Sequence, residues 1–349
     1  MISFSSLCLN SAQSLVFFAP SKAENMNYIK TIVIPNRERD EDFFSEPGMG
    51  KVTGKDAITD EIISYVDFNV RRTCYTSIYP FGIFRDKNLS PITLSDITLF
   101  CGSNGCGKST LLNVIAEKLK LERMSAYNKT VFMQPFVDMT YVELSASAKD
   151  NFDPQAIGRI ITSDDVFNHM LLSREKNERM DFMRERMFSK ISEYRKSYNL
   201  PREINFDNPD SVTEFNCHYD ARSMSQSKYI KKHLGMDEKL HSNGESGFLY
   251  FTDAIQPNGL YLLDEPENSL SVQLQIKLVE YIELMARFYN CQFIIATHSV
   301  FMQSIHNAQI YNLDATPVIT TKWTELPNVR LYYDFFKKHE AEFEQPNIE

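Results

Sequence analysis

The chain has 349 residues, of which 43% are hydrophobic, enough to fill the core of one large domain or two ordinary ones. Its formal net charge of −9 gives no general attraction for nucleic acid or anionic membranes, so DNA binding would need a local basic patch. No apolar run approaches the roughly 20 residues of a membrane-spanning helix, and we therefore expect a globular, cytoplasmic protein without a membrane span.

The N-terminal part is predicted to consist of an extension, a loop and several strands. Residues 1–26 are expected to be a disordered extension, because a strand-like run follows directly after Met26; a start codon assigned too early is the alternative. No basic residue precedes the weakly apolar stretch at 15–19, as a secretory signal would require. A polar, charged loop is expected at 36–60. Runs rich in β-branched and aromatic residues predict strands at 28–34, 63–70, 76–84 and 92–101.

The remaining elements alternate between helical and strand-like sequence. Helices are predicted at 111–121, from about 164 to 200, and at 272–288, and strands at 131–135, 259–264 and 291–297. This alternation predicts an α/β fold with a mainly parallel sheet, interrupted by an inserted helical subdomain. We assign 27–144 and 242–349 to the core and 145–241 to the insertion.

The cysteines indicate a reducing compartment. They form no CxxC pair and no His/Cys cluster at zinc-ligand spacing, so we expect free thiols. The six are Cys8, Cys74, Cys101, Cys106, Cys217 and Cys291.

The strongest signal is a glycine-rich loop that fits G-x-x-x-x-G-K-[ST] between a predicted strand and a predicted helix. Its glycines let backbone N–H groups surround phosphate oxygens at the positive end of a helix. Lys108 would reach the β- and γ-phosphates, Ser109 would be a ligand of Mg²⁺, and Thr110 would add a phosphate hydrogen bond. An ordinary glycine turn is the alternative. The predicted nucleotide-binding residues are Gly102, Ser103, Asn104, Gly105, Cys106, Gly107, Lys108, Ser109 and Thr110.

A second signal is the hydrophobic run at 260–263, which ends in Asp264-Glu265-Pro266-Glu267. A buried strand would deliver two carboxylates to the sheet edge that faces the phosphates. Asp264 could then hold the hydrated Mg²⁺ while Glu265 polarises the attacking water. An acidic loop is the alternative interpretation.

Together these motifs resemble the ATP-binding-cassette (ABC) ATPases, within them the soluble AAA-like branch with chromosome-maintenance, break-repair and overcoming-lysogenization-defect proteins. The resemblance covers nearly everything after Met26 and implies an ABC-type P-loop fold with antiparallel N-terminal strands. It also implies ATP and Mg²⁺ as cofactors. In that family a strand ends in a histidine that contacts the γ-phosphate, and His298 after the apolar run at 294–297 matches it. A structural histidine is the alternative.

The family's signature L-S-G-G-Q is similar to Ser242-Asn-Gly244-Glu-Ser246 in this chain. The match implies that Ser242 and Gly244 bind ATP held by a second protomer, so that a homodimer closes around the nucleotide. A plain turn is the alternative, because Ser, Asn and Gly favour turns. Gln134 resembles the glutamine that senses Mg²⁺, although it follows Lys108 sooner than usual. Ser271 stands where many relatives have aspartate, which implies different communication between the two sites.

Three further groups of residues leave alternatives open. Tyr79, Phe81 and Phe84 suit adenine stacking and equally suit the core. A basic group could bind a partner or could be a solvated helix surface; it comprises Arg222, Lys228, Lys231 and Lys232. The helical segment that follows Asp164 interleaves arginines with acidic residues, which favours pairing within the helix. Those charged residues are Arg174, Glu175, Glu178, Arg179, Asp181, Arg184, Glu185 and Arg186.

The resemblance implies a motor or regulatory ATPase that acts on a protein effector, nuclease or toxin-like, or on DNA. The chain is also similar to the compact ATPases of bacterial anti-phage modules, where a separate nuclease or toxin is held in check; this is an analogy at the level of the fold. The ATPase subunit of a membrane transporter is the alternative, and the departure from L-S-G-G-Q disfavours it. An ATP-gated nuclease would need a further carboxylate cluster, but about 50 residues follow His298 and Asp314 is the sole acid at 310–314.

Overall fold

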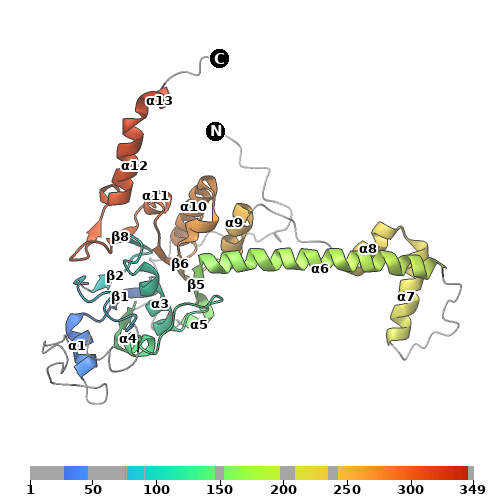
Figure 1. The fold of residues 1–349 in the computed structure, drawn as a ribbon, viewed down its shortest axis with the longest axis horizontal. Coiled ribbons are helices and arrows are strands. Elements are labelled where there is room, and N and C mark those ends of the chain that lie inside the picture. The colour runs from blue at the N-terminus through green and yellow to red at the C-terminus, as the bar shows by residue number, and fades with distance from the viewer. Residues whose placement is uncertain are drawn as a thin grey trace, which may run out of the picture.

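The computed structural model describes residues 27–45, 75, 77–89, 91–145, 153–196, 209–234 and 243–344. The predicted extension at 1–26, the predicted strand at 63–70 and the signature residue Ser242 lie outside the described residues. Figure 1 shows a body of sheet and helices from which two helical projections extend, one formed by α6 (Ser163–Lys196) and the other by α12 (Pro327–Lys338) and α13 (Glu340–Glu344).

The centre of the body is a six-stranded sheet with the strand order β5-β6-β7-β3-β8-β9. Its strands are parallel except for β9, which pairs antiparallel with β8. This arrangement confirms the predicted mainly parallel sheet. The strands are β3 (Ile97–Cys101), β5 (Gly158–Thr162), β6 (Leu260–Asp264), β7 (Gln292–Ala296), β8 (Gln309–Asn312) and β9 (Thr320–Thr321).

A small antiparallel sheet completes the predicted N-terminal architecture. It has the order β2-β1-β4, formed by β2 (Ile92–Thr93), β1 (Ile29–Val33) and β4 (Tyr141–Leu144). The buried amide of Gln292 ties it to the large sheet, because its Oε1 accepts from the backbone N–H of Tyr28 and Ile29 while its Nε2 donates to the Ile29 carbonyl. A fully buried side-chain amide is thus satisfied by backbone groups.

Helices cover both faces of the large sheet, because successive residues of a buried strand point to opposite faces. Leu260 and Leu262 of β6 belong to the core with Leu111, on the face covered by α3 (Lys108–Leu119) and α4 (Met133–Met139). Tyr261 and Leu263 belong to the other core, under α9 (Asn243–Ala254), α10 (Val272–Phe288) and α11 (Val300–Gln303). The continuous apolar runs of β6 and β7 therefore follow from burial on both sides.

The predicted helical insertion appears as a long arm. α6 (Ser163–Lys196) extends from the body and meets α7 (Pro209–Ser223) and α8 (Gln226–Leu234) at its far end (Figure 1). Pairs between Arg179 and Glu175, 2.6 Å apart, and between Arg184 and Asp181, 2.7 Å apart, confirm the expected pairing within the helix. β5 lies inside the assigned range 145–241 but belongs to the central sheet, so the helical part of the insertion begins at α6.

Of the basic group, Lys228, Lys231 and Lys232 lie on α8, at the far end of the arm, and Arg222 lies in the last turn of α7. Tyr229 and Ile230 are buried there with Ile191 of α6, and Lys232 Nζ lies 2.6 Å from the buried Asp220 carboxylate. These contacts give α8 a structural role within the arm, and partner binding by the basic group stays a prediction.

Several local predictions were wrong. Residues 37–45, expected in a loop, form α1 (Arg37–Ser45), where Arg37 pairs with Glu41 one turn on. The segment 77–84, inside the strand predicted at 76–84, consists of bends and turns, since Pro80 lacks an N–H and Gly82 has φ 87°. The expected strand at 131–135 gives way to α4, and the one at 92–101 divides into β2 and β3. The remaining elements are the short helices α5 (Pro154–Ile157), η1 (Pro266–Ser269) and η2 (Trp323–Glu325).

Four cysteines lie in the described residues, and each is a free thiol as predicted: Cys101, Cys106, Cys217 and Cys291. In this part of the chain no helix is long and apolar enough to cross a membrane.

Candidate nucleotide-binding site

The glycine-rich loop connects the end of β3 to the start of α3 and forms an open cradle. Gly102, Gly105 and Gly107 have φ of 150°, 81° and 103°, values that other residues rarely adopt. A Cβ on Gly107 would lie 2.6 Å from Ile83 Cγ2, whereas one on Gly105 would meet nothing within 4 Å. The first turn of α3 has no side-chain cap, so its leading N–H groups remain available to an anion. The backbone therefore fits a polyphosphate.

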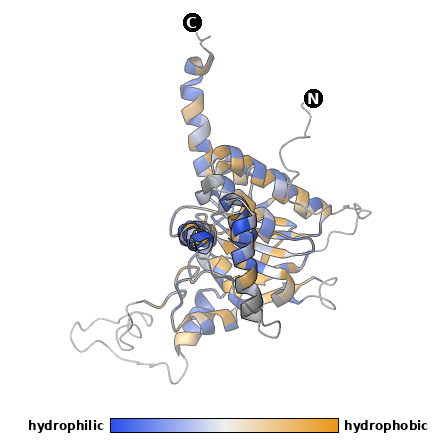
Figure 2. Cartoon of the chain, turned by 90° about the vertical axis from the view of Figure 1, so that its right-hand side faces the viewer, coloured by the Kyte–Doolittle hydropathy of each residue, from blue (hydrophilic) through white to orange (hydrophobic). Residues whose placement is uncertain are grey.

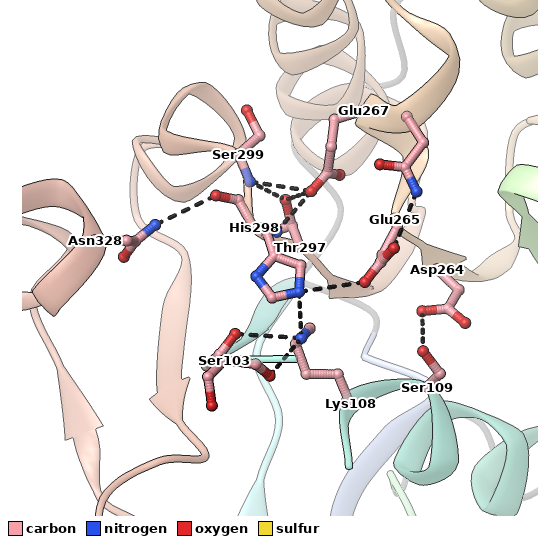
Figure 3. A network of polar contacts seen from close by, with 12 residues as sticks. Ser103, Lys108, Ser109, Asp264, Glu265, Glu267, Thr297, His298, Ser299 and Asn328 are labelled. Atoms are coloured by element: carbon pink, nitrogen blue, oxygen red, sulfur yellow. Dashed lines mark hydrogen bonds and ion pairs between the residues drawn. The ribbon is translucent and has the colours of Figure 1, made fainter. Parts of the chain in front are cut away.

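Lys108 points into this cradle and connects it to the end of β7. The side chain is 4% exposed, and its Nζ donates to the carbonyls of Gly102 at 3.2 Å and Ser103 at 3.1 Å. Its third contact is His298 Nε2 at 2.6 Å (Figure 3). An ammonium group only donates, so Nε2 is the acceptor in this contact. A buried cation thus stands between the loop and His298.

Ser109 and Asp264 meet across the same space. Ser109 Oγ donates to Asp264 Oδ1 at 2.9 Å. Burial raises the pKa of Asp264 to about 6, the Ser109 hydrogen bond opposes this rise, and the neighbouring Glu265 adds to it. A carboxylate whose charge is poorly solvated gains from a bound cation, and hydroxyl and carboxylate oxygens are the ligands that Mg²⁺ prefers. The pair therefore fits the predicted metal role.

Glu265 is held in an uncommon backbone conformation that aims its side chain at His298. Its φ is 48°, and its N–H donates to the Ala296 carbonyl of the adjacent strand. The carboxylate lies 3.3 Å from His298 Nε2 and accepts a hydrogen bond from Asn268 Nδ2 at 2.9 Å (Figure 3). Left-handed backbone at a non-glycine residue is often retained at functional sites. The adjacent carboxylates of Asp264 and Glu265 thus face different partners.

Glu267 has a supporting role that sequence reasoning missed. Its Oε1 accepts from Thr297 Oγ1 at 2.8 Å and from the backbone N–H groups of His298 at 2.6 Å and Ser299 at 3.0 Å (Figure 3). This buried carboxylate therefore fixes the turn that carries His298. The sequence shows Glu267 beside Glu265, but no pattern shows which backbone it would meet.

Asp314 also contacts the loop, although it was noted before only as a solitary acid. Its Oδ2 accepts from the Ser103 N–H at 2.6 Å and its Oδ1 accepts from Ser103 Oγ at 2.7 Å. Both contacts hold Ser103, whose carbonyl also accepts a hydrogen bond from Lys108 Nζ. Within the described residues, no group of three or more His, Cys, Asp or Glu side chains could hold a metal ion.

Arg123 is a second cation that the sequence did not reveal. Its Nη2 donates to Asn113 Oδ1 at 2.5 Å, and its guanidinium lies over the Tyr127 ring. The buried Nε and Nη1 have no hydrogen-bond partner in the described chain. Burial lowers the pKa of Arg123, and the charge of Asp264 is among the opposing influences. The buried and incompletely paired Arg123 guanidinium therefore lies where the charge of Asp264 influences it.

Gln134 lies in α4, and its Nε2 donates to Asp138 Oδ1 of the same helix at 2.9 Å. The residues directly across from Asp264 in the sheet are Thr162 on β5 and Ala296 on β7. In this arrangement Thr162, which donates to Asp165 Oδ2, is the polar side chain nearest in register. The structure thus brings Thr162, and not Gln134, to the strand position beside Asp264.

The aromatic candidates for adenine stacking separate into two groups. Phe81 and Phe84 are buried in the core. Tyr79 is partly buried, and its hydroxyl donates to Thr110 Oγ1 at 3.1 Å, beside the start of α3.

Of the two signature residues, Gly244 lies in the first turn of α9, where an added Cβ would meet Leu274 Cδ1 at 3.0 Å. Ser242 cannot be placed with it, since it lies outside the described residues.

A glycine loop with a buried lysine at the start of a helix, opposite an Asp-Glu pair on a parallel strand, defines a P-loop ATPase. The family whose description is "ABC transporter" matches residues 91–268. This match spans more than half of the chain, which therefore belongs to this family and is an ABC-type ATPase. A second family, described as "AAA domain, putative AbiEii toxin, Type IV TA system", matches residues 238–302 and agrees with the AAA-like resemblance.

Three solved structures are similar to the chain. One is an Smc head domain with an extended coiled coil bound to the C-terminal domain of ScpA, from Pyrococcus furiosus. It is 13% identical, the match covers 72% of this chain and 95% of that chain, and the TM-score is 0.35. A nucleotide-free ATP-binding cassette from an ABC transporter has 17% identity, coverage of 70% and 90%, and a TM-score of 0.34. A dimeric ATP-binding cassette in a post-hydrolysis state bound to ADP and Pi has 12% identity, coverage of 68% and 90%, and a TM-score of 0.32. No curated protein matches the chain.

Proposed function

We propose that this ATPase works as a head-to-tail homodimer that closes around ATP and thereby drives or regulates a protein effector. The observation that supports it is the convergence of three side chains: His298 Nε2 lies 2.6 Å from Lys108 Nζ and 3.3 Å from the Glu265 carboxylate. Such a cluster suits a site in which one cation, one base and one imidazole surround a single phosphate group.

Each residue has a distinct part in this proposal. Lys108 leaves His298 Nε2 and donates to the β- and γ-phosphate oxygens, and the N–H groups from Gly105 to Thr110 donate to the remaining oxygens. Ser109 and Asp264 hold Mg²⁺, which neutralises phosphate charge when bound. Glu265 accepts a proton from the attacking water, and His298, with its position fixed by Glu267, contacts the γ-phosphate.

The proposal of a dimer rests on the resemblance of residues 242–246 to the family's signature sequence. Gly244 lies at the start of α9, against the segment that precedes α10. We propose that Gly244 and Ser242 meet the ATP held by the other protomer, so that the γ-phosphate bridges two chains. Loss of that phosphate then reopens the dimer. The assignment of Gln134 as a Mg²⁺ sensor stays a prediction, and Thr162 is the better-placed candidate.

We further propose that the α6–α8 arm passes this motion to an effector in the cytoplasm. The match to a family described as an AAA domain and putative AbiEii toxin supports a nuclease-like or toxin-like effector in an anti-phage module. The family description "ABC transporter" supports the alternative of a transporter subunit. Affinity purification from the native cell separates these functions, because it yields a toxin-like protein or a nuclease in one case and a membrane permease in the other. DNA that stays bound through the purification would support a DNA-directed role.

The sandwich is tested by Glu265→Gln, which keeps the side-chain shape and removes the base. Turnover should fall roughly 10²- to 10⁴-fold while ATP binding persists. Light scattering at a chain concentration low enough for the nucleotide-free protein to be monomeric should then show the dimer mass with Mg-ATP, and the double variant Lys108→Ala/Glu265→Gln should not respond to nucleotide. A Glu265→Gln protein that stays monomeric at this concentration under saturating Mg-ATP would contradict the ATP-bridged dimer.

A further inference from the structure

The C-terminal helices α12 and α13 carry an unusual amount of exposed apolar surface. They stand away from the body in Figure 1, and Figure 2 shows hydrophobic residues along the same projection. Six apolar or aromatic side chains on them are each more than half exposed. These are Leu331, Tyr332, Tyr333, Phe335, Phe336 and Phe343. So large an uncovered apolar surface indicates an interaction site.

The sequence of α12 places its charged and its apolar residues on different sides of the helix. At about 100° per residue, the charged residues form one stripe and the apolar residues occupy the broad remaining arc. Within the described chain, Val329 is the one buried residue of α12. The stripe consists of Arg330, Asp334, Lys337 and Lys338; Arg330 and Asp334 lie at its centre, and the two lysines lie at its edges beside the apolar arc. A helix with so wide an apolar arc is stabilised when a second surface covers it.

A cleft of about 810 Å³ lies against the base of this helix. Aromatic side chains of α12 and of the segment before it line the outer part, among them Trp323, Tyr333 and Phe336. Its other wall includes Glu267 and His298 of the nucleotide site. The apolar surface therefore continues from the projecting helix to the turn that holds His298.

One hydrogen-bonded residue joins the helix to that turn. Asn328, at the start of α12, donates through Nδ2 to the His298 carbonyl at 3.3 Å and to Gln303 Oε1 at 2.9 Å (Figure 3). A partner that shifts α12 would thus move a group bonded to the backbone of His298.

The charges of the projection favour a second copy of the same chain as the partner. The last turn of α12 is basic, with Lys337 and Lys338, whereas α13 is acidic, with Glu340 and Glu342. When the two-fold axis that relates two such segments is perpendicular to them, the segments run antiparallel and the basic turn of each faces the acidic helix of the other. Homodimer interfaces are also richer in apolar and aromatic contacts than transient ones.

We propose that the apolar face of α12 and α13, with the cleft at its base, binds the same face of a second copy without nucleotide. This contact goes beyond the ATP-bridged dimer proposed above and does not depend on it. It keeps two protomers together between cycles.

Nucleotide-free light scattering at roughly 50 µM chain, where an interface of micromolar affinity is filled, should give the dimer mass. The variant Leu331→Ser/Phe335→Ser should weaken dimerisation at least about tenfold, because both side chains are exposed in the monomer and buried in the pair. Asp334→Ser on the charged stripe is the matched control and should leave the mass unchanged. A monomer at this concentration, or a dimer indifferent to the Leu331/Phe335 change, would overturn the proposal.

A charge exchange distinguishes a second copy from any other partner. Lys337→Glu/Lys338→Glu makes the projection acidic, and Glu340→Lys/Glu342→Lys makes it basic, so neither variant should dimerise alone. An equimolar mixture should form the heterodimer, and Trp323, the single tryptophan, should shift its emission to the blue as the cleft closes. If both variants keep the thermal stability of the parent but the mixture stays monomeric, a second copy is not the partner. Because this assay contains no nucleotide, its failure leaves the ATP-bridged dimer untouched, and failure of that dimer leaves this contact untouched.

Discussion

The substitution Glu267→Ala tests how the position of His298 is maintained. Glu267 is 9% exposed, and its Oε1 accepts three hydrogen bonds from the turn between β7 and α11. The Ser299 N–H has a second acceptor in Thr297 Oγ1, at 3.0 Å. The substitution therefore leaves two donors, the Thr297 hydroxyl and the His298 N–H, without a replacement.

The free-energy change follows from these two donors. Each unsatisfied buried group costs about 1–3 kcal/mol, which gives about 2–6 kcal/mol for the pair. The Glu267 Oε2 atom is buried without a partner, so removal of the carboxylate relieves part of its desolvation. We therefore expect unfolding to become easier by about 2–4 kcal/mol. Glu267→Gln keeps an acceptor but loses its charge, and should cost about 1–2 kcal/mol.

The assay combines urea unfolding with steady-state ATP hydrolysis. Because the turn holds His298 and not the phosphate loop, Glu267→Ala should lower kcat roughly 10- to 100-fold and leave ATP affinity nearly unchanged. Glu283→Ala is the matched control, since Glu283 accepts from the His306 backbone N–H at 2.8 Å, away from the site. If Glu267→Ala unfolds within about 0.5 kcal/mol of the parent and keeps its kcat, the reasoning is refuted.

Three further substitutions test other parts of the structure. Lys108→Ala should weaken ATP binding roughly 100-fold or more in a nucleotide titration, whereas Lys118→Ala, on the same helix, should not. Gly107→Ala forces a Cβ to within 2.6 Å of Ile83 and should abolish ATP binding and lower the melting temperature; a normal affinity would contradict the φ of 103°. Burial raises the pKa of Asp40 to about 6. The ionised carboxylate therefore destabilises the folded state above about pH 6, by about 3 kcal/mol at most. This destabilisation disappears below about pH 4, where Asp40 is protonated in the folded and in the unfolded chain. Asp40→Asn should accordingly be more stable than the parent at pH 7.5 and equal to it near pH 4; a constant difference would refute that pKa.

The sequence was most informative where local pattern and buried strand coincide. The helix predicted at 272–288 has those bounds in the structure, and the strand at 259–264 appears as Leu260–Asp264. The phosphate loop was also predicted, because its glycines are required by local backbone geometry. Short apolar runs were ambiguous, and the run at 131–135 leads into a helix because Met133 and Phe136 pack against the α3 side of the core.

Contacts between distant segments could not be predicted from one sequence. Glu267 reaches the His298 turn over 31 residues, and Asp314 reaches Ser103 over 211. Arg123 carries no motif, and its place near Asp264 depends on the path of the chain after α3. The choice of Gln134 as the Mg²⁺ sensor was limited in the same way, because the sequence does not show that β5, within the segment assigned to the insertion, is the strand beside Asp264.

The central claim is that triphosphate is held by the loop around Lys108 and that Ser109 and Asp264 hold its metal ion. Isothermal titration of the full chain with ATP, with and without Mg²⁺, tests it most directly. The account predicts one ATP per chain, tighter binding with Mg²⁺, and loss of the Mg²⁺ effect in Asp264→Asn. Binding that does not respond to Mg²⁺ in the parent protein, or that responds equally in Asp264→Asn, would contradict it.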